Sequence, residues 1–317
     1  MRRRLAFLGT PEMAVPPLEA LVGAGHDVTV AVTRPDRRRG RGPATSPSPV
    51  KAAAVRLGIA VAHRVDAVLE AAPDLGVVVA YGRIIPERIL AEVPMVNLHF
   101  SLLPRWRGAA PVERALLAGD RVTGACLMKL DAGLDTGPVY ACRQVPIAPG
   151  DHLATLRDRL VQVGTGLLVD TLAGPLPEPV AQAGEATYAE KIAPGELELR
   201  WDRPAVELDR VVRLGRAWTT WRGRRLRVLA ADVVPLPGRA PDGAGAAGTG
   251  MPAAAPGSLL GDVAVTGDGG LRLREVQPEG KAAMPGADWV RGARPGPDER
   301  LGGASGSGSP GPDDRLA

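Results

Sequence analysis

An amide and an imidazole stand two residues apart at the end of an apolar run, where residues 97–111 read NLHFSLLPRWRGAAP. Side chains at positions i and i+2 of a β-strand share a face, so we expect Asn97 and His99 to point at one spot. Further along, LDAGLDTG places Asp131 and Asp135 in a glycine-bracketed loop that can reach the same spot. Together these residues supply a hydrogen-bond donor, a titrating base and a carboxylate that orients the base, which acyl transfer between small groups requires.

Each of these residue types is also common for structural reasons alone. An asparagine near a strand end is often a turn former or a cap, and a single histidine is often a hydrogen-bonded core residue. Asp131 fits either a polar role near a bound ligand or a cap of its own loop. Ser101 lies in SLLP, which lacks the strained elbow of a serine nucleophile, so we interpret it as a turn residue. We interpret His26, His63 and His152 as structural.

The first 150 or so residues alternate short β-type runs with helical segments. The runs are too continuously apolar for a sheet with one wet face, which predicts a parallel sheet buried between helices. One helix is expected over 15–24, where two prolines fit the first turn. The pattern is typical of a doubly wound α/β fold, in which ligands collect at the carboxyl ends of strands, and His99 lies at such an end. The predicted strands are 4–9, 27–33, 58–62, 74–80 and 95–99.

The rest of the chain predicts two further parts. Strands over 123–130 and 138–147 flank the aspartate loop, and a helix over 153–173 follows. After a proline-rich stretch and a helix over 204–215, short alternating strands with glycine-rich turns predict a small OB-like β-barrel.

With 317 residues the chain suits two domains of unequal size. We predict a catalytic domain over 1–175, a linker over 176–204 and a C-terminal β-barrel domain over 205–301. The remaining residues, 302–317, are predicted to be a disordered tail, and the Gly/Ala-rich stretch 238–257 a flexible loop.

Two cysteines, Cys126 and Cys142, lie in apolar, strand-like text without metal-ligand spacing. We interpret them as reduced core residues rather than as a disulfide or a catalytic pair, which fits a cytoplasmic protein. No metal site is predicted. The apolar run that follows the basic start MRRR ends within four residues, too short for a signal peptide or a membrane span.

The formal net charge is +4 and the pI about 9.4, which suggests an anionic partner. Residues 34–51 contain six basic residues against one acid, and residues 210–227 contain seven arginines and no acid. Two separate basic segments favour a large polyanion over a single phosphate. The alternative is the solvated surface of an arginine-rich protein.

These residues resemble the folate-dependent formyltransferases. The match is N-x-H-x-SLLP-x-x-RGAAP at 97–111 with LDTG at 134–137, which members acting on glycinamide ribonucleotide and on nucleotide sugars share. These motifs therefore indicate the chemistry more strongly than the acceptor. Further segments resemble the tRNA-directed branch of the family, namely 7–21, 34–42, 48–51, 187–192 and 277–284.

The resemblance implies a Rossmann-like domain that takes the formyl group from 10-formyltetrahydrofolate, its co-substrate. It implies initiator methionyl-tRNA as the acceptor, a monomer, and no membrane partner. The alternative is a small-molecule N-formyltransferase that acts on a nucleotide amino sugar with the same folate donor. A catalytically inactive RNA-binding protein is a third possibility, which the intact motifs disfavour.

The resemblance also assigns roles to single residues. Asn97, His99 and Asp135 are the catalytic residues, with Asn97 and protonated His99 as donors to the oxyanion of a tetrahedral intermediate. The residues expected at the folate are Ser101, Leu102, Leu103, Pro104, Arg83, Ile84, Ile85 and Asp131. The residues expected at the tRNA are Arg34, Arg38, Arg39, Arg41, Lys51, Arg213 and Arg224.

Overall fold

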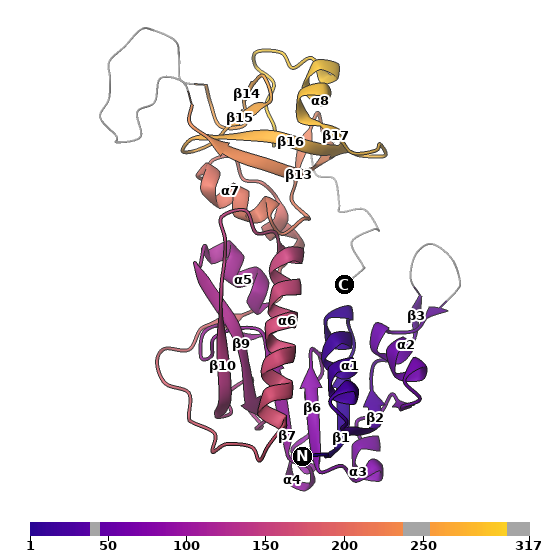
Figure 1. The fold of residues 1–317 in the computed structure, drawn as a ribbon. Helices are drawn as coiled ribbons and strands as arrows, with labels where there is room; N and C mark the ends of the chain where they lie inside the picture. Colours follow the sequence, from indigo (N-terminus) through magenta and orange to yellow (C-terminus); the bar gives the residue numbers. More distant parts are fainter. Residues whose placement is uncertain (39–44, 237–253, 303–317) are drawn as a thin grey trace. The chain divides into compact units, whose positions relative to one another are not determined.

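The computed structural model describes residues 1–38, 45–236 and 254–302, and the chain forms two compact units (Figure 1). The first consists of 1–115 with 120–191, and the second of 116–119 with the residues from 192 onward. The division between Lys191 and Ile192 falls inside the segment predicted as a linker. Most of the stretch 238–257 and of the tail 302–317 lies outside the described residues.

A seven-stranded sheet forms the first unit, in the order β10-β9-β7-β6-β1-β2-β5. The sheet contains five neighbouring parallel strands, β7, β6, β1, β2 and β5. Strands β9 and β10 are added antiparallel at the edge next to β7. All seven correspond to predicted runs, which confirms the doubly wound, mostly parallel α/β fold. They are β1 (Arg4–Gly9), β2 (Asp27–Val32), β5 (Ala60–Ala62), β6 (Leu75–Val79), β7 (Met95–His99), β9 (Val122–Lys129) and β10 (Val139–Pro146).

Helices and short elements complete this unit. Ser48 caps α2 by accepting from the backbone N–H of Lys51, and the prolines at the start of α1 fit its first turn. The helical elements are η1 (Glu12–Ala14), α1 (Val15–Gly23), α2 (Pro49–Arg56), α3 (Ala67–Ala71), α4 (Glu87–Glu92), α5 (Pro111–Ala118) and α6 (Leu153–Leu172). The short strands are β3 (Arg37–Arg38), β4 (Thr45–Ser46), β8 (Arg107–Gly108) and β11 (Tyr188–Ala189).

The two faces of the sheet differ where β7 meets β9. A Cβ on Gly164 of α6 would lie 3.2–3.3 Å from Phe100, Ala125 and Leu98, so α6 packs closely on the face to which Leu98 points. Asn97 and His99 alternate with Leu98 and therefore face the opposite side. On that side α3 and α4 pack against a core that includes Met95.

The second unit contains an antiparallel sheet in the order β12-β13-β16-β15-β14, with β17 paired to β16. This agrees with the predicted small β-domain, and among the described residues its end strands β12 and β14 are not paired with each other. The strands are β12 (Trp218–Trp221), β13 (Arg224–Val234), β14 (Leu259–Leu260), β15 (Val263–Val265), β16 (Gly270–Pro278) and β17 (Met284–Pro285).

Its helical elements are η2 (Pro194–Leu197), α7 (Ala205–Val212) and α8 (Gly286–Ala293). Helix α8 was absent from the sequence-based expectation, because eight residues with two glycines have low helix propensity. Burial stabilises it: Trp289 is buried in the core of this unit and meets Trp221 edge to face, with ring centroids 5.6 Å apart. Among the described residues, no helix is both long and apolar enough to cross a bilayer.

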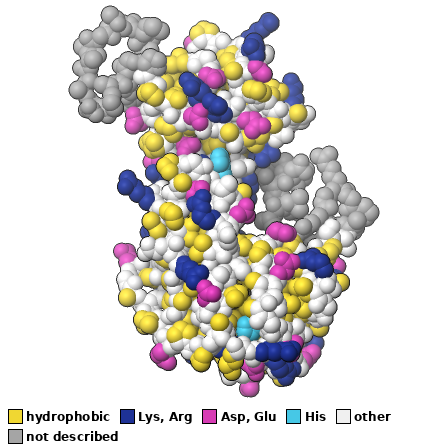
Figure 2. Space-filling view, in the orientation of Figure 1, with side chains coloured by type: hydrophobic (Ala, Val, Ile, Leu, Met, Phe, Trp, Pro, Cys, Tyr) yellow, Lys and Arg dark blue, Asp and Glu magenta, His cyan; other side chains and the backbone are white. Residues whose placement is uncertain are grey.

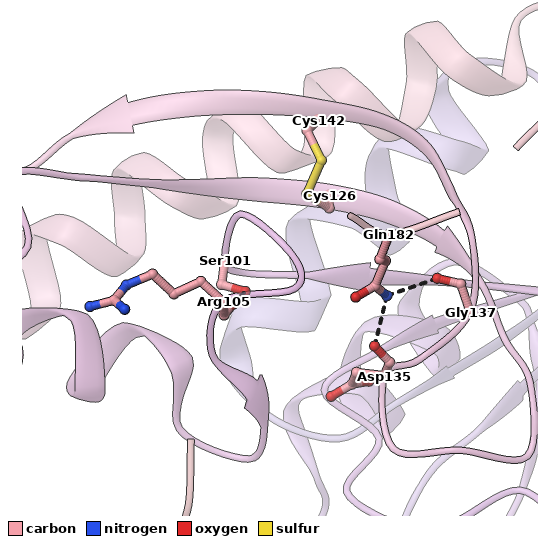
Figure 3. Close-up of a disulfide and its surroundings, with 7 residues drawn as sticks. All are labelled: Ser101, Arg105, Cys126, Asp135, Gly137, Cys142 and Gln182. Atoms are coloured by element: carbon pink, nitrogen blue, oxygen red, sulfur yellow. Dashed lines mark hydrogen bonds between the residues drawn. A yellow bond between two sulfur atoms is a disulfide. The ribbon is translucent and has the colours of Figure 1, made fainter. Parts of the chain in front are cut away.

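The prediction of two reduced cysteines is wrong. Cys126 of β9 and Cys142 of β10 are directly opposite in the antiparallel ladder, with Cα atoms 4.1 Å apart, and form a disulfide (Figure 3). Their 16-residue separation does not reveal this, because the register shifts at an irregularity between Val139 and Ala141. His99 is the register partner of Cys126 on the other side, so the disulfide lies on the face of the sheet to which His99 points.

The disulfide predicts a defined pattern of thiol labelling. Denatured protein treated with iodoacetamide should take up no label without reductant and two labels after dithiothreitol, because the chain has only two cysteines. Mass spectrometry of the intact chain measures both states. Two labels in the unreduced sample would show that the cysteines are free and would restore the original prediction.

Candidate functional site

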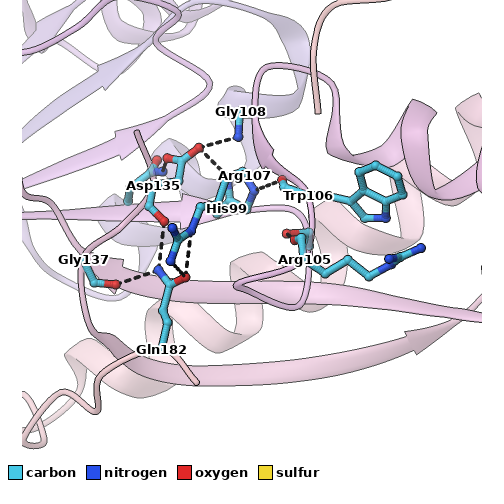
Figure 4. A network of polar contacts seen from close by, with 10 residues as sticks. His99, Arg105, Trp106, Arg107, Gly108, Asp135, Gly137 and Gln182 are labelled. Carbon is cyan, nitrogen blue, oxygen red and sulfur yellow. Dashed lines mark hydrogen bonds and ion pairs between the residues drawn. The ribbon is translucent and has the colours of Figure 1, made fainter. Parts of the chain in front are cut away.

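The structure brings together the three residues predicted to be catalytic, Asn97, His99 and Asp135. Figure 4 shows His99 and Asp135 with the groups around them. One carboxylate oxygen of Asp135 accepts from Asn97 Nδ2 at 3.3 Å, and the other accepts from the backbone N–H of Gly108 at 2.8 Å. The second oxygen also lies 3.6 Å from His99 Nδ1. Both His99 and Asp135 are largely buried, with side chains 6% and 12% exposed. The carboxylate thus joins β7, β8 and the aspartate loop.

A backbone carbonyl determines the tautomer of His99. Its Nε2 lies 2.8 Å from the carbonyl oxygen of Trp106, which can only accept, so Nε2 carries the hydrogen. Nδ1 faces the Asp135 carboxylate. The contact with Trp106 at 2.8 Å is within hydrogen-bond range and the contact with Asp135 at 3.6 Å is not, so the backbone carbonyl fixes the tautomer. An oxygen faces each ring nitrogen, which suits a ring that takes up and passes on a proton at Nδ1.

Local hydrogen bonds and a glycine shape the loop that carries Asp135. Asp131 Oδ1 accepts from the N–H of Gly133 at 3.1 Å and from Thr136 Oγ1 at 2.7 Å, so Asp131 caps its own loop. Asp135 has a left-handed backbone with φ of 53°. At Gly137, a Cβ would lie 1.9 Å from the carbonyl oxygen of Lys129, so no other residue fits there unchanged. The LDTG motif thus has a steric basis.

The turn after β7 is anchored from within. Ser101 is fully buried and its hydroxyl donates to the carbonyl of Arg105 at 2.5 Å, which is the predicted turn role. Arg105 forms a two-bond ion pair with Asp120 at 2.6 and 2.9 Å, and the indole N–H of Trp106 donates to the same carboxylate at 2.8 Å. These bonds hold the Trp106 backbone, whose φ is 63°, so that its carbonyl meets His99.

The segments predicted to bind folate leave large apolar side chains in solvent. Ile84 is 89% exposed and Leu134 is 59% exposed. Ile84 lies in the loop that follows β6, the neighbour of β7 in the sheet, and Leu134 directly precedes Asp135 in the sequence. Exposed apolar surface beside a few fixed polar groups fits a flat, edge-bonding ring system such as a pterin. Among the other predicted residues, Arg83 is exposed, Ile85 is buried, and Leu102, Leu103 and Pro104 are half-buried.

The basic residues near the N-terminus have partners within the protein. Arg34 donates to the carbonyl of Gly82 at 2.6 Å, and Lys51 forms an ion pair with Asp36 at 2.7 Å. Arg38 lies in β3, which pairs with β4. The predicted contacts Arg39 and Arg41 lie outside the described residues.

The basic residues of the second unit are also engaged. Arg224 lies 3.6 Å from Glu279, and Arg213 is half-buried at the end of α7. On the face drawn in Figure 2, Lys and Arg side chains occur singly or beside acidic groups rather than as one continuous basic area.

Sequence reasoning missed the groups that hold the trio in place. Gln182 donates to the carbonyls of Asp135 and Gly137, both at 2.8 Å, and accepts from Arg107. Two backbone groups, the Trp106 carbonyl and the Gly108 N–H, also contact the trio. Backbone N–H and carbonyl groups occur in nearly every residue, so the sequence does not indicate which of them will contact a site. For Gln182 the only available indication was the motif-like segment 187–192 just after it, because the segment itself was interpreted as a linker.

Among the described residues, no group of three or more His, Cys, Asp or Glu side chains is arranged to hold a metal ion.

Comparison with known proteins identifies relatives of both units. A family described as formyl transferase matches residues 3–172, and its C-terminal domain matches 191–294. The curated methionyl-tRNA formyltransferase of Thermobifida fusca (strain YX) is 43% identical over 323 residues, covering 94% of this chain and 99% of that protein.

Two solved structures share the fold at low identity. HypX from Aquifex aeolicus, in complex with tetrahydrofolic acid, aligns with 92% of this chain at a TM-score of 0.61 and 16% identity. The chain spans 48% of that protein, about half its length. A methionyl-tRNA formyltransferase from Clostridium thermocellum aligns with 73% of this chain and 93% of its own at a TM-score of 0.53 and 16% identity.

The geometry of the aspartate loop predicts a steric cost at Gly137. Gly137→Ala should lower the free energy of unfolding by about 1–3 kcal/mol, because the new methyl group must displace the Lys129 carbonyl. Chemical denaturation measures the change. Gly150→Ala is the matched control, since a Cβ at Gly150 meets no atom within 4 Å. Equal stability of the two variants would contradict the packing described for Gly137.

Proposed function

The chain belongs to the formyl transferase family, and on that premise we propose that it transfers the formyl group of 10-formyltetrahydrofolate to the α-amino group of initiator methionyl-tRNA. The observation that carries the proposal is the match along nearly the whole chain to a methionyl-tRNA formyltransferase, with the Asn97–His99–Asp135 trio assembled. The product is the formylated initiator used to begin translation.

10-Formyltetrahydrofolate supplies a formyl carbon on nitrogen, whose oxygen becomes negative when an amine attacks. Asn97 Nδ2 has two hydrogens and gives one to Asp135, so the other is available to that oxygen. His99 was expected to be a protonated donor to the same oxygen, but its Nε2 hydrogen goes to the Trp106 carbonyl, so we assign it to proton transfer instead: Nδ1 and the Asp135 carboxylate receive the proton that the amine loses. When the intermediate collapses, the bond between the formyl carbon and the folate nitrogen breaks, and that nitrogen takes up the proton as tetrahydrofolate leaves. The Trp106 carbonyl keeps the opposite edge of the imidazole occupied, which aims Nδ1 at the reaction.

The evidence for tRNA as the acceptor is less direct than the evidence for formyl transfer. A nucleotide amino sugar would use the same trio, but it has no use for two separate arginine-rich segments. Residues 34–51 and 210–227 support a tRNA acceptor, with Arg34, Arg38, Arg39, Arg41, Lys51, Arg213 and Arg224 as the proposed contacts. Since charged tRNA is used in the cytoplasm, we place the protein there, acting as a monomer.

A transfer assay with several acceptors tests this function. Purified protein with 10-formyltetrahydrofolate should formylate initiator methionyl-tRNA in preference to elongator methionyl-tRNA, and a nucleotide amino sugar should remain unmodified. His99→Ala should reduce the rate by on the order of 10²-fold or more, since it removes a group at the reacting atoms. Formylation of the amino sugar alone would establish the alternative function.

The salt dependence of binding tests the proposed tRNA contacts. Each phosphate contact that is removed should reduce the slope of log Kd against log salt concentration by about 1, so Arg213→Ala and Arg224→Ala should each flatten the slope. Arg291→Ala is the control, because Arg291 pairs with Asp288 on α8 and is not a proposed contact. Unchanged slopes for both test variants would remove these arginines from the interface.

A further inference from the structure

We propose that residues 180–189 form a strap across the site and that Gln182, acting with Arg107, is a positioning residue for formyl transfer; this rests on the proposed function. The segment was expected to be a linker. In the structure it contacts both loops that carry the catalytic groups, and Gln182 lies at the point where they meet (Figures 3 and 4).

The Gln182 amide uses its full hydrogen-bonding capacity. Nε2 donates to the carbonyls of Asp135 and Gly137, each at 2.8 Å. Oε1 accepts from Arg107 Nε at 3.1 Å and from Arg107 Nη2 at 2.7 Å. The opposite orientation would set oxygen against two carbonyls and N–H groups against a guanidinium, so the environment specifies one orientation. Such a fully satisfied group acts as a rigid spacer between the two loops.

The Gln182 bond to the Asp135 carbonyl acts where the backbone is least favourable. Asp135 has a φ of 53°, a left-handed conformation that is unfavourable for a residue with a side chain. Gln182 binds the backbone carbonyls of Asp135 and Gly137, on either side of Thr136, and these two bonds fix that conformation. The conformation in turn determines where the carboxylate points, toward Asn97, His99 and the Gly108 N–H.

The rest of the strap fixes the loop that follows β7, over residues 106–110, by hydrogen bonds of the same kind. Thr187 Oγ1 accepts from the backbone N–H of Trp106, and the Thr187 carbonyl accepts from that of Arg107, both at 2.9 Å. Strand β11 pairs in parallel with β8, and the Ala189 carbonyl accepts from Ala109 and Ala110. These bonds set the Trp106 carbonyl that meets His99 and the Gly108 N–H that meets Asp135. The start of the strap is tethered by a bridge between Val180 and Val139.

Two substitutions separate positioning from simple stabilisation. Gln182→Ala removes all four hydrogen bonds. Gln182→Glu keeps the shape and the acceptors for Arg107 but places a carboxylate oxygen against the carbonyls of Asp135 and Gly137. If the strap positions Asp135, both variants should lose about 10- to 100-fold in kcat with little change in KM, although the Glu variant retains its pairing with Arg107.

Gln162→Glu is the control for the added carboxylate. Gln162 is exposed on α6, in the same unit as Gln182, and α6 packs on the face of the sheet opposite to Asn97 and His99. Its kcat at saturating tRNA should equal that of the wild-type protein. Thermal unfolding of all variants should accompany the kinetics, because a merely structural Gln182 would lose activity in proportion to stability.

A second readout does not depend on turnover. The chain has four histidines, so the imidazole NMR signals of His99 can be resolved and compared between variants at one fixed pH. Both Gln182 variants should change the His99 imidazole chemical shifts, because the Asp135 carboxylate and the Trp106 carbonyl beside the ring move, and the control should not. A wild-type kcat or unchanged His99 signals in either Gln182 variant overturn the proposal, as does activity that follows stability. An inactive wild-type protein would instead refute the proposed function, and the His99 signals would still decide whether the strap orders the site.

Discussion

The site depends on one carboxylate being held among donors that come from different parts of the chain. Asp135 is approached by Asn97 from β7, by a backbone N–H from β8 and by His99. A charged group fixed in this way needs no reorganisation when charge develops nearby, which is the basis of electrostatic preorganisation. Every other feature of the site, including the LDTG glycine and the Trp106 carbonyl, serves to place these groups around that carboxylate.

The features that could be predicted from the sequence are those that depend on residue type and on the spacing of apolar and polar residues. Continuous apolar runs indicated the buried strands, and the two-residue spacing of Asn97 and His99 placed them on one face. The register between β9 and β10 does not follow from residue type or spacing, so the pairing of Cys126 with Cys142 was missed. The contribution of Gln182 was missed for a related reason, since a glutamine in glycine- and proline-rich text has no local pattern that distinguishes a strap from a linker.

The basic segments show how a charge count overstates the charge that is available. Lys51 already pairs with Asp36, Arg224 with Glu279, and Arg34 with a backbone carbonyl. A phosphate that takes up one of these side chains must replace an existing partner, so the net gain is smaller than that of a free cation. Binding of a polyanion would then depend more on where these groups can be redirected than on how many there are.

The strap also has a consequence for how the protein is made. The bonds that complete the site join residues far apart in sequence: 38 residues separate Asn97 from Asp135, 47 separate Asp135 from Gln182, and 81 separate Trp106 from Thr187. A chain emerging from the ribosome can form the parallel part of the sheet well before these contacts become possible. The contacts of the strap can therefore form only after residue 189 has emerged, whereas the last parallel strand already ends at His99, so the sheet of this enzyme can precede its site during synthesis.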